Sequence, residues 1–176
     1  MKPIVAIVGR PNVGKSTLFN RISGTRKAIV DDMPGVTRDR NYLDVTWDDH
    51  TFTMIDTGGF EPEAKEGLLA QMREQAMLAV EEADLIVFLA DGKEGLMPAD
   101  YEVAELLRRS TKPLVFAVNK IDSKKRMEGL YDFYALGLPE PIPVSAEHGT
   151  GTDDLMDRIL SLIPKYSEEP LSEDVT

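Results

Sequence analysis

The stretch Gly9-Arg10-Pro11-Asn12-Val13-Gly14-Lys15-Ser16-Thr17 decides how the rest of the chain is interpreted. It matches the pattern G-x-x-x-x-G-K-S/T, which requires a strand before it and a helix after it. The apolar, β-branched run 4–8 predicts a buried strand, and the apolar residues within 18–22 have helical spacing. The sequence therefore predicts a glycine-rich loop that joins a buried strand to a helix.

Such a loop is suited to bind phosphate. Its glycines let successive backbone N–H groups turn inward, at a helix N-terminus that already favours negative charge. Lys15 can then reach the β- and γ-phosphates of a nucleotide, and the Ser16 hydroxyl can bind Mg²⁺. The loop alone indicates a nucleotide without saying which base it carries.

The composition limits the class of protein. The chain has 176 residues, 42% hydrophobic and 29% charged, which suits one globular domain with a core. Cysteine is absent, which excludes disulfides and thiolate chemistry. His50 and His148 are too far apart to indicate a metal cluster, and we interpret both as surface residues. Apolar runs are shorter than a signal peptide or membrane span requires, so we expect a cytoplasmic protein without a membrane partner.

The charge balance argues against direct nucleic-acid binding by this segment. The chain has 20 basic and 31 acidic residues, a net charge of −11, whereas nucleic-acid-binding surfaces are basic. A local basic patch stays compatible with this balance. Residues 166–176 are acidic and contain Pro170, so we expect a linker or tail there, after a domain that spans residues 1–165.

Strand and helix patterns alternate along the chain. Strands are predicted at 42–47, 51–54, 84–90, 113–118 and 141–144, helices at 66–82, 98–109, 125–134 and 155–163, and a long loop at 27–40. This alternation is typical of an α/β fold. We predict a P-loop NTPase fold: a mostly parallel six-stranded sheet with one antiparallel edge strand and helices on both faces. In such folds ligands bind beyond the carboxyl ends of the strands.

Asn119-Lys120-Ile121-Asp122 follows a predicted strand and can select the base. The Asp122 carboxylate can accept from N1–H and the exocyclic amino group of guanine, whereas adenine has no donor at either position. Missing partners of this kind can discriminate by several powers of ten. The Lys120 stem can lie along the base, and Asn119 can tie this loop to the glycine loop. Ser145-Ala146 offers a backbone N–H to guanine O6, so the predicted ligands are GTP and GDP.

Asp56-Thr57-Gly58-Gly59-Phe60 also follows a strand and indicates the γ-phosphate site. Asp56 can hold Mg²⁺ through water, together with the hydroxyls of Ser16 and Thr37. The Gly59 N–H can bond the γ-phosphate. Because the contacts of Thr37 and Gly59 depend on the γ-phosphate, hydrolysis would release both loops and so act as a conformational switch.

Taken in order, these motifs resemble the motif set of translation-factor-class GTPases of the TrmE-Era-EngA type. Stretches 9–21, 35–40 and 91–96 are similar to the first GTPase domain of the bacterial Der (EngA) family, and the resemblance covers about residues 1–165. It implies hydrolysis of GTP and a role in assembly of the large ribosomal subunit. It also implies two partners within the same protein, a second GTPase domain and a KH-like domain. Met97-Pro98 departs from the Thr-Pro expected there, which affects only a helix cap.

The way in which water is activated is the open question. Ras-type GTPases place a glutamine after Asp-x-x-Gly, where this chain has Phe60, which cannot hydrogen-bond water. Similar GTPases with an asparagine at the position of Asn12 are thought to bind K⁺ there, so we expect Asn12 to hold K⁺. Alternatively, Arg38 or Arg40 acts as an arginine finger. The residues assigned catalytic roles are Lys15, Thr37, Gly59 and Asn12.

Two other functions stay open at this stage. The chain could be a module that binds GTP or GDP as a signal with negligible hydrolysis. It could also be a GTPase of the Era type or the tRNA-modification type. For the predicted GTPase we expect slow intrinsic turnover that K⁺ stimulates.

Overall fold

A computed structural model describes residues 2–23, 28–31, 42–57 and 67–164. The strands are β1 Ile4–Val8, β2 Ala28–Asp31, β3 Tyr42–Trp47, β4 His50–Asp56, β5 Leu85–Asp91, β6 Leu114–Asn119 and β7 Ile142–Pro143. The helices are α1 Lys15–Ser23, α2 Leu68–Glu82, α3 Pro98–Arg109, α4 Lys124–Gly129, the 3-10 helix η2 Leu130–Leu136 and α5 Thr152–Leu162. Among these helices, none combines the length and apolar character needed to cross a membrane.

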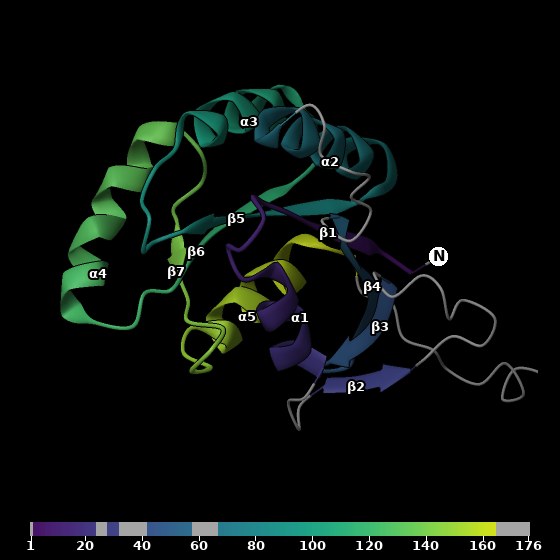
Figure 1. The fold of residues 1–176 in the computed structure, drawn as a ribbon. Coiled ribbons are helices and arrows are strands. Elements are labelled where there is room, and N and C mark those ends of the chain that lie inside the picture. The colour runs from purple at the N-terminus through teal and green to yellow at the C-terminus, as the bar shows by residue number, and fades with distance from the viewer. Residues whose placement is uncertain (1, 24–27, 32–41, 58–66, 165–176) are drawn as a thin grey trace, which may run out of the picture.

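A single twisted sheet forms the middle layer of the molecule, in the order β2-β3-β4-β1-β5-β6-β7 (Figure 1). Helices α2 and α3 cover one face, and α1 and α5 cover the other. Strand β1 is central, between the parallel neighbours β4 and β5. The loop that follows β1 therefore emerges at the middle of the sheet.

The central strands are continuously apolar because consecutive residues pack into two different cores. In β1, Val5 and Ile7 belong to the core with α1 and α5, while Ala6 and Val8 belong to the core with α2, α3 and η2. Strand β5 alternates in the same way. A strand covered on both faces needs apolar residues at every position, which is the pattern typical of parallel sheets.

The predicted α/β fold, mostly parallel with helices on both faces, is confirmed. Within the described residues the sheet has seven strands, one more than the six predicted, because Ala28–Asp31 forms β2 within a stretch predicted as loop. Strand β3 is the antiparallel strand, and it pairs with both β2 and β4. The antiparallel strand was predicted at the edge of the sheet, but β2 occupies that edge. Pairing with β2 uses the backbone groups of β3 that an edge strand leaves unpaired.

Smaller differences concern the β3–β4 turn and the segment after β6. His50, interpreted as a surface residue, is half-buried at the start of β4. The helix predicted over 125–134 is divided into α4 and the 3-10 helix η2, which ends at Gly137 in a left-handed conformation with φ 67°. The last strand, β7, has only two residues.

The sheet register brings the carboxyl ends of four strands together. Ile7 of β1 pairs with Asp56 of β4, and Asp91 of β5 pairs with Asn119 of β6. All of these positions lie at the end of the sheet from which the glycine loop emerges. The fold thus gathers the predicted motifs along one edge, as expected for a ligand site at strand ends.

Candidate nucleotide-binding site

Both glycines of the loop are required because other backbone and side-chain atoms approach them closely. A Cβ on Gly9 would lie 2.5 Å from the Leu89 carbonyl oxygen, and one on Gly14 would lie 2.1 Å from Asn119 Nδ2. Gly14 also has φ +103°, and Asn12 has φ +67°. Asparagine tolerates this left-handed region better than most residues. The glycine pattern of the sequence thus has a steric cause.

Lys15 begins α1 and folds back over the loop. Its Nζ donates to the carbonyl oxygen of Gly9 and, at 3.1 Å, to that of Arg10. The side chain is buried, whereas Ser16 and Thr17 are exposed in the first turn of the helix. An ammonium group, two hydroxyls and a helix N-terminus therefore meet at one place, which suits the binding of phosphate and its metal ion.

Arg10 directs its guanidinium away from this place. Nε donates to Asp100 at 3.3 Å, Nη1 to Glu94 at 3.1 Å and Nη2 to the Gly95 carbonyl at 3.4 Å, and the residue is 4% exposed. Burial raises the pKa of Asp100, although the hydrogen bond from the Met97 N–H and the charge of Arg10 oppose this. We expected Arg10 to bind nucleotide. Its side chain is occupied by these partners, so only its backbone can contact a phosphate.

Asn119 joins the glycine loop to the loop after β7. Its Nδ2 donates to the Val13 carbonyl at 2.8 Å, and its Oδ1 accepts from the Ala146 N–H at 2.9 Å. The predicted tie between Asn119 and the glycine loop is confirmed. The Ala146 N–H, expected to read guanine O6, already bonds Asn119, so contact with O6 requires a shared hydrogen bond. Ser145 is buried and starts the same loop.

Lys120 makes a second connection between the loops. It has φ +68°, and its Nζ donates to the Asn12 carbonyl at 2.8 Å and to Asp91 Oδ2 at 2.7 Å. Burial acts to raise the pKa of Asp91, but hydrogen bonds from Lys120 and from the N–H groups of Glu94 and Lys93 more than offset it, so this pKa lies below its usual value. Asp91 was not predicted as a site residue, although it ends a strand just as Asp56 and Asn119 do.

We expect Asp91→Asn to lower the free energy of unfolding by about 1–3 kcal/mol at neutral pH, because the amide leaves the Lys120 ammonium without its carboxylate. The folded-state pKa of Asp91 lies below the unfolded value of 3.8, so the carboxylate stabilises the fold above that pH. This contribution is lost as the pH falls through the folded-state pKa. Urea unfolding of both proteins from about pH 7 to about pH 2 measures it.

The matched control is Asp132→Asn, because Asp132 is exposed on η2. We expect this control to unfold like the wild type at every pH. A stability difference between wild type and Asp91→Asn that stays constant down to the lowest pH would contradict the role given to Asp91.

Gln75 of α2 lies under the glycine loop. Its Oε1 accepts from the Gly9 N–H at 3.3 Å and from the Thr57 hydroxyl at 3.1 Å. The Thr57 hydroxyl also lies 2.6 Å from the Ile7 carbonyl, so the end of β4 is joined to β1. Asp56, the residue before Thr57, is buried at the end of β4. Gln75 was missed because it sits among the core positions of an amphipathic helix.

Asp122 is accessible on the loop before α4. Its carboxylate lies 3.9 Å from His148 Nε2, and their side chains are 38% and 57% exposed. The interpretation of His148 as a surface residue is confirmed, and its place beside Asp122 was not foreseen. Thr37, Arg38, Arg40, Gly58, Gly59 and Phe60 lie outside the described residues, as does the expected tail 166–176.

Asn119 thus joins the glycine loop to the loop that follows β7 at the carboxyl ends of the strands. Residues 4–120 match the family described as 50S ribosome-binding GTPase. The chain belongs to this family. The predicted class of protein, a GTPase, is therefore confirmed, and the ligand of the site is a guanine nucleotide.

Curated relatives of this family member are proteins named GTPase Der. That of Geotalea daltonii is 57% identical over 176 residues, which is 100% of this chain and 40% of the relative. That of Clostridium novyi is 56% identical over 168 residues, 96% of this chain and 38% of the relative. The predicted resemblance to Der is confirmed, and the chain spans about 40% of the length of these relatives.

Solved structures of another GTPase, Era, are also similar. One, in complex with MgGDPNP and nucleotides 1506–1542 of 16S ribosomal RNA, has a TM-score of 0.68 and 31% identity, covering 97% of this chain and 63% of that one. An Aquifex aeolicus Era variant bound to GDP.AlF4⁻ has a TM-score of 0.70 and 34% identity, covering 97% and 60%. Both contain a guanine nucleotide or its analogue.

Proposed function

We propose that this chain is a GTP-driven conformational switch that hydrolyses GTP to GDP and phosphate within a protein that acts in assembly of the large ribosomal subunit. The observation that carries the proposal is the pair of hydrogen bonds made by Asn119. They join the phosphate loop, which is the glycine loop of residues 9–17, to the base-reading loop, which is the loop after β7 at residues 145–150. Residues 1–165 form the switch domain, and residues 166–176 lead to a second GTPase domain and a KH-like domain. Similarity to GTPase Der supports this larger context.

Mg²⁺ fits the donors at this site. The Ser16 hydroxyl is exposed at the start of α1, and Asp56 ends β4 beside β1, so a hydroxyl and a carboxylate lie on neighbouring elements. Mg²⁺ is usually held by one or two protein oxygens, with phosphates and water completing its coordination. We assign Ser16 and Thr37 as its ligands, with Asp56 holding it through water. The ion neutralises the negative charge of the phosphates.

The residues of the chain act chiefly by electrostatic stabilisation. Lys15 and the N–H groups at the start of α1 face the phosphate position, where they stabilise the charge that develops on the transferred group. The Gly59 N–H supplies a further donor to the γ-phosphate. Phe60 supplies no group that could orient water, so we propose that intrinsic hydrolysis is slow.

The single experiment that tests the proposal is a phosphate-release assay on the 176-residue chain with GTP and, separately, ATP. We expect release from GTP only, because Asp122 can pair with guanine and not with adenine. The alternative is a binding module with negligible hydrolysis, which Phe60 favours. Tight GTP binding without phosphate release in a single-turnover experiment would support that alternative.

K⁺ is proposed as the cation that replaces an arginine finger. Asn12 is exposed, and Lys120 already occupies its carbonyl, so the side-chain amide oxygen is the donor left for an ion. We expect turnover to be about tenfold faster in K⁺ than in Na⁺, which corresponds to about 1.4 kcal/mol of barrier. The rate of phosphate release, measured in buffers that differ only in K⁺ or Na⁺, gives this ratio.

Asn12→Gly is the variant that isolates this role, because glycine adopts the same positive φ without an amide oxygen. We expect its rates in K⁺ and Na⁺ to be equal. Asn20→Ala, an exposed position on α1, should keep the K⁺ dependence of the wild type. Equal wild-type rates in the two salts, or K⁺ stimulation that survives in Asn12→Gly, would rule out the assignment.

A further inference from the structure

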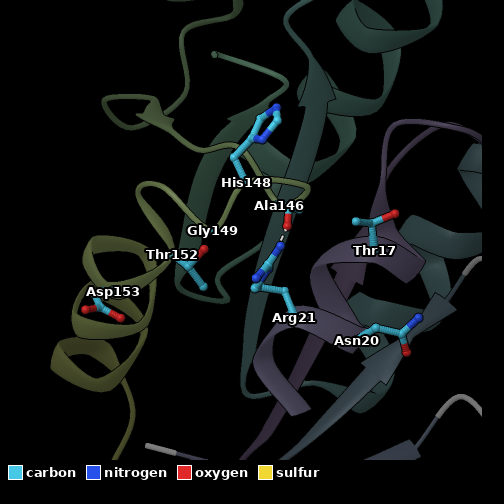
Figure 2. A pocket seen from close by; sticks show the side chains of 8 residues that line it. All are labelled: Thr17, Asn20, Arg21, Ala146, His148, Gly149, Thr152 and Asp153. Atoms are coloured by element: carbon cyan, nitrogen blue, oxygen red, sulfur yellow. Dashed lines mark hydrogen bonds between the residues drawn. The ribbon is translucent and has the colours of Figure 1, made fainter. Parts of the chain in front are cut away.

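Arg21, in the last turn of α1, holds the loop that follows β7. Its Nε donates to the Ala146 carbonyl at 2.9 Å, and its Nη2 donates to the Glu147 carbonyl. Figure 2 shows the guanidinium extending from α1 toward Ala146, with the dashed hydrogen bond between them. One side chain thus bonds two consecutive carbonyls of a loop far away in the sequence.

The Ala146 residue is consequently held from both sides. Its N–H donates to Asn119 Oδ1, and its carbonyl accepts from Arg21. The loop also has internal hydrogen bonds, from the Ser145 N–H to the Thr150 carbonyl at 2.8 Å and from the Gly149 N–H to the Ser145 carbonyl at 2.7 Å. These bonds shape the loop but do not place it relative to α1. Arg21 does so.

The hydrogen bonds of Arg21 lie at the side of a cavity. A cavity of about 550 Å³ lies between α1, the loop and the start of α5, lined by residues that include Thr17, Arg21, His148 and Thr152 (Figure 2). The space around the guanidinium is open, whereas on the inner side Ala146 packs into the same apolar core as Leu18 and Ile22 of α1. A Cβ on Gly149 would lie 3.4 Å from Arg21 Nη1, so the loop approaches the guanidinium closely.

We propose that Arg21 is a positioning residue for guanine recognition, which holds the Ala146 peptide where its N–H can reach O6 of the base. The same helix carries Lys15 and Ser16 at its other end, so Arg21 fixes the base-reading loop relative to the phosphate-binding groups. A planar guanidinium with separate donors suits two carbonyls, whereas a lysine ammonium is a single point. This inference rests on the proposed function, in which guanine occupies this site.

Arg21→Met tests the inference because methionine keeps an unbranched stem and helix propensity but has no donor. Binding of GDP is compared with that of 6-thio-GDP, in which a weakly accepting sulfur replaces O6 while both donors to Asp122 remain. We expect the wild type to bind GDP more tightly than 6-thio-GDP. Arg21→Met should bind GDP about tenfold more weakly, through faster release, and should lose most of the preference for GDP over 6-thio-GDP. The single-turnover hydrolysis rate at saturating GTP should stay within about twofold, so that KM changes and kcat does not.

Two further variants complete the experiment. Arg21→Lys keeps the charge and one donor, so it should recover part of the affinity for GDP, and it decides the question if Arg21→Met does not fold. Arg73→Met removes an exposed arginine that pairs with Glu102 at 2.7 Å between α2 and α3, and should behave as wild type.

The outcomes separate the inference from the proposed function. A wild-type chain that does not bind GDP would overturn the proposed function itself. A wild-type chain that prefers GDP, with an unchanged preference and affinity in the Arg21 variants, would overturn only the positioning role. An equal loss of GDP and 6-thio-GDP binding together with the hydrolysis rate would also overturn it, because that result indicates a general structural role.

Discussion

Lys15→Ala should abolish GTP hydrolysis, lowering the single-turnover rate by about 100-fold or more. The carbonyl oxygens of Gly9 and Arg10 hold the ammonium group over the loop. A charge fixed in this way requires little reorganisation when negative charge spreads over the phosphoryl oxygens. Phosphate release measured at saturating GTP reports the loss directly.

The control for this experiment is Lys124→Ala, since Lys124 is exposed at the start of α4. Lys15 is buried, so the folded state of Lys15→Ala should be verified by circular dichroism and thermal unfolding before rates are compared. Lys15→Arg, which keeps the charge but alters the geometry, should also be slow. A folded Lys15→Ala protein with the wild-type rate would show that the phosphate site has been assigned to the wrong loop.

Asp122→Asn should reverse the choice of base from guanine to xanthine. Xanthine carries a carbonyl oxygen where guanine has its amino group, so the asparagine amide can donate where the carboxylate could only accept. We expect the affinity for GDP to fall by about 100-fold or more, with a comparable gain for the xanthine nucleotide. Competition of both nucleotides against a fluorescent analogue gives the two constants.

The substitution should leave the fold intact because Asp122 is exposed and lies 3.9 Å from His148, beyond hydrogen-bond distance. Asp132→Asn, on the exposed side of η2, is the matched change of carboxylate to amide and should keep the preference for GDP. Selectivity for guanine that survives in Asp122→Asn would assign the recognition of the base to other groups.

The sequence predicted the elements of the site because each motif residue follows an apolar strand. Parallel strands place their carboxyl ends together, so the convergence of Lys15, Asp56 and Asn119 could be foreseen from chain order alone. The tie from Asn119 to the glycine loop could be foreseen too, because Asn119 follows its strand at the same edge of the sheet as the glycine loop.

The supporting residues could not be predicted in the same way. Arg21 and Gln75 sit on helices where their spacing is that of ordinary helix residues. Arg21 bonds two backbone carbonyls, and Gln75 bonds a backbone N–H and the Thr57 hydroxyl, so no motif in the sequence marks these pairs. The direction of Arg10 depends on Asp100, which is 90 residues away and reads as a helix cap. Strand β2 was missed because its pairing with β3 is decided by tertiary contacts more than by local propensity.

The bridge made by Asn119 has a kinetic consequence. Because its hydrogen bonds to Val13 and Ala146 join the two loops through the chain's own groups, the loss of conformational entropy needed to order them belongs to folding. We therefore expect nucleotide binding to need little further ordering of these loops and the residence time of the nucleotide to be long. A partner that accelerates nucleotide exchange would act by separating the Val13 and Ala146 backbones from Asn119, rather than by competing for the phosphates.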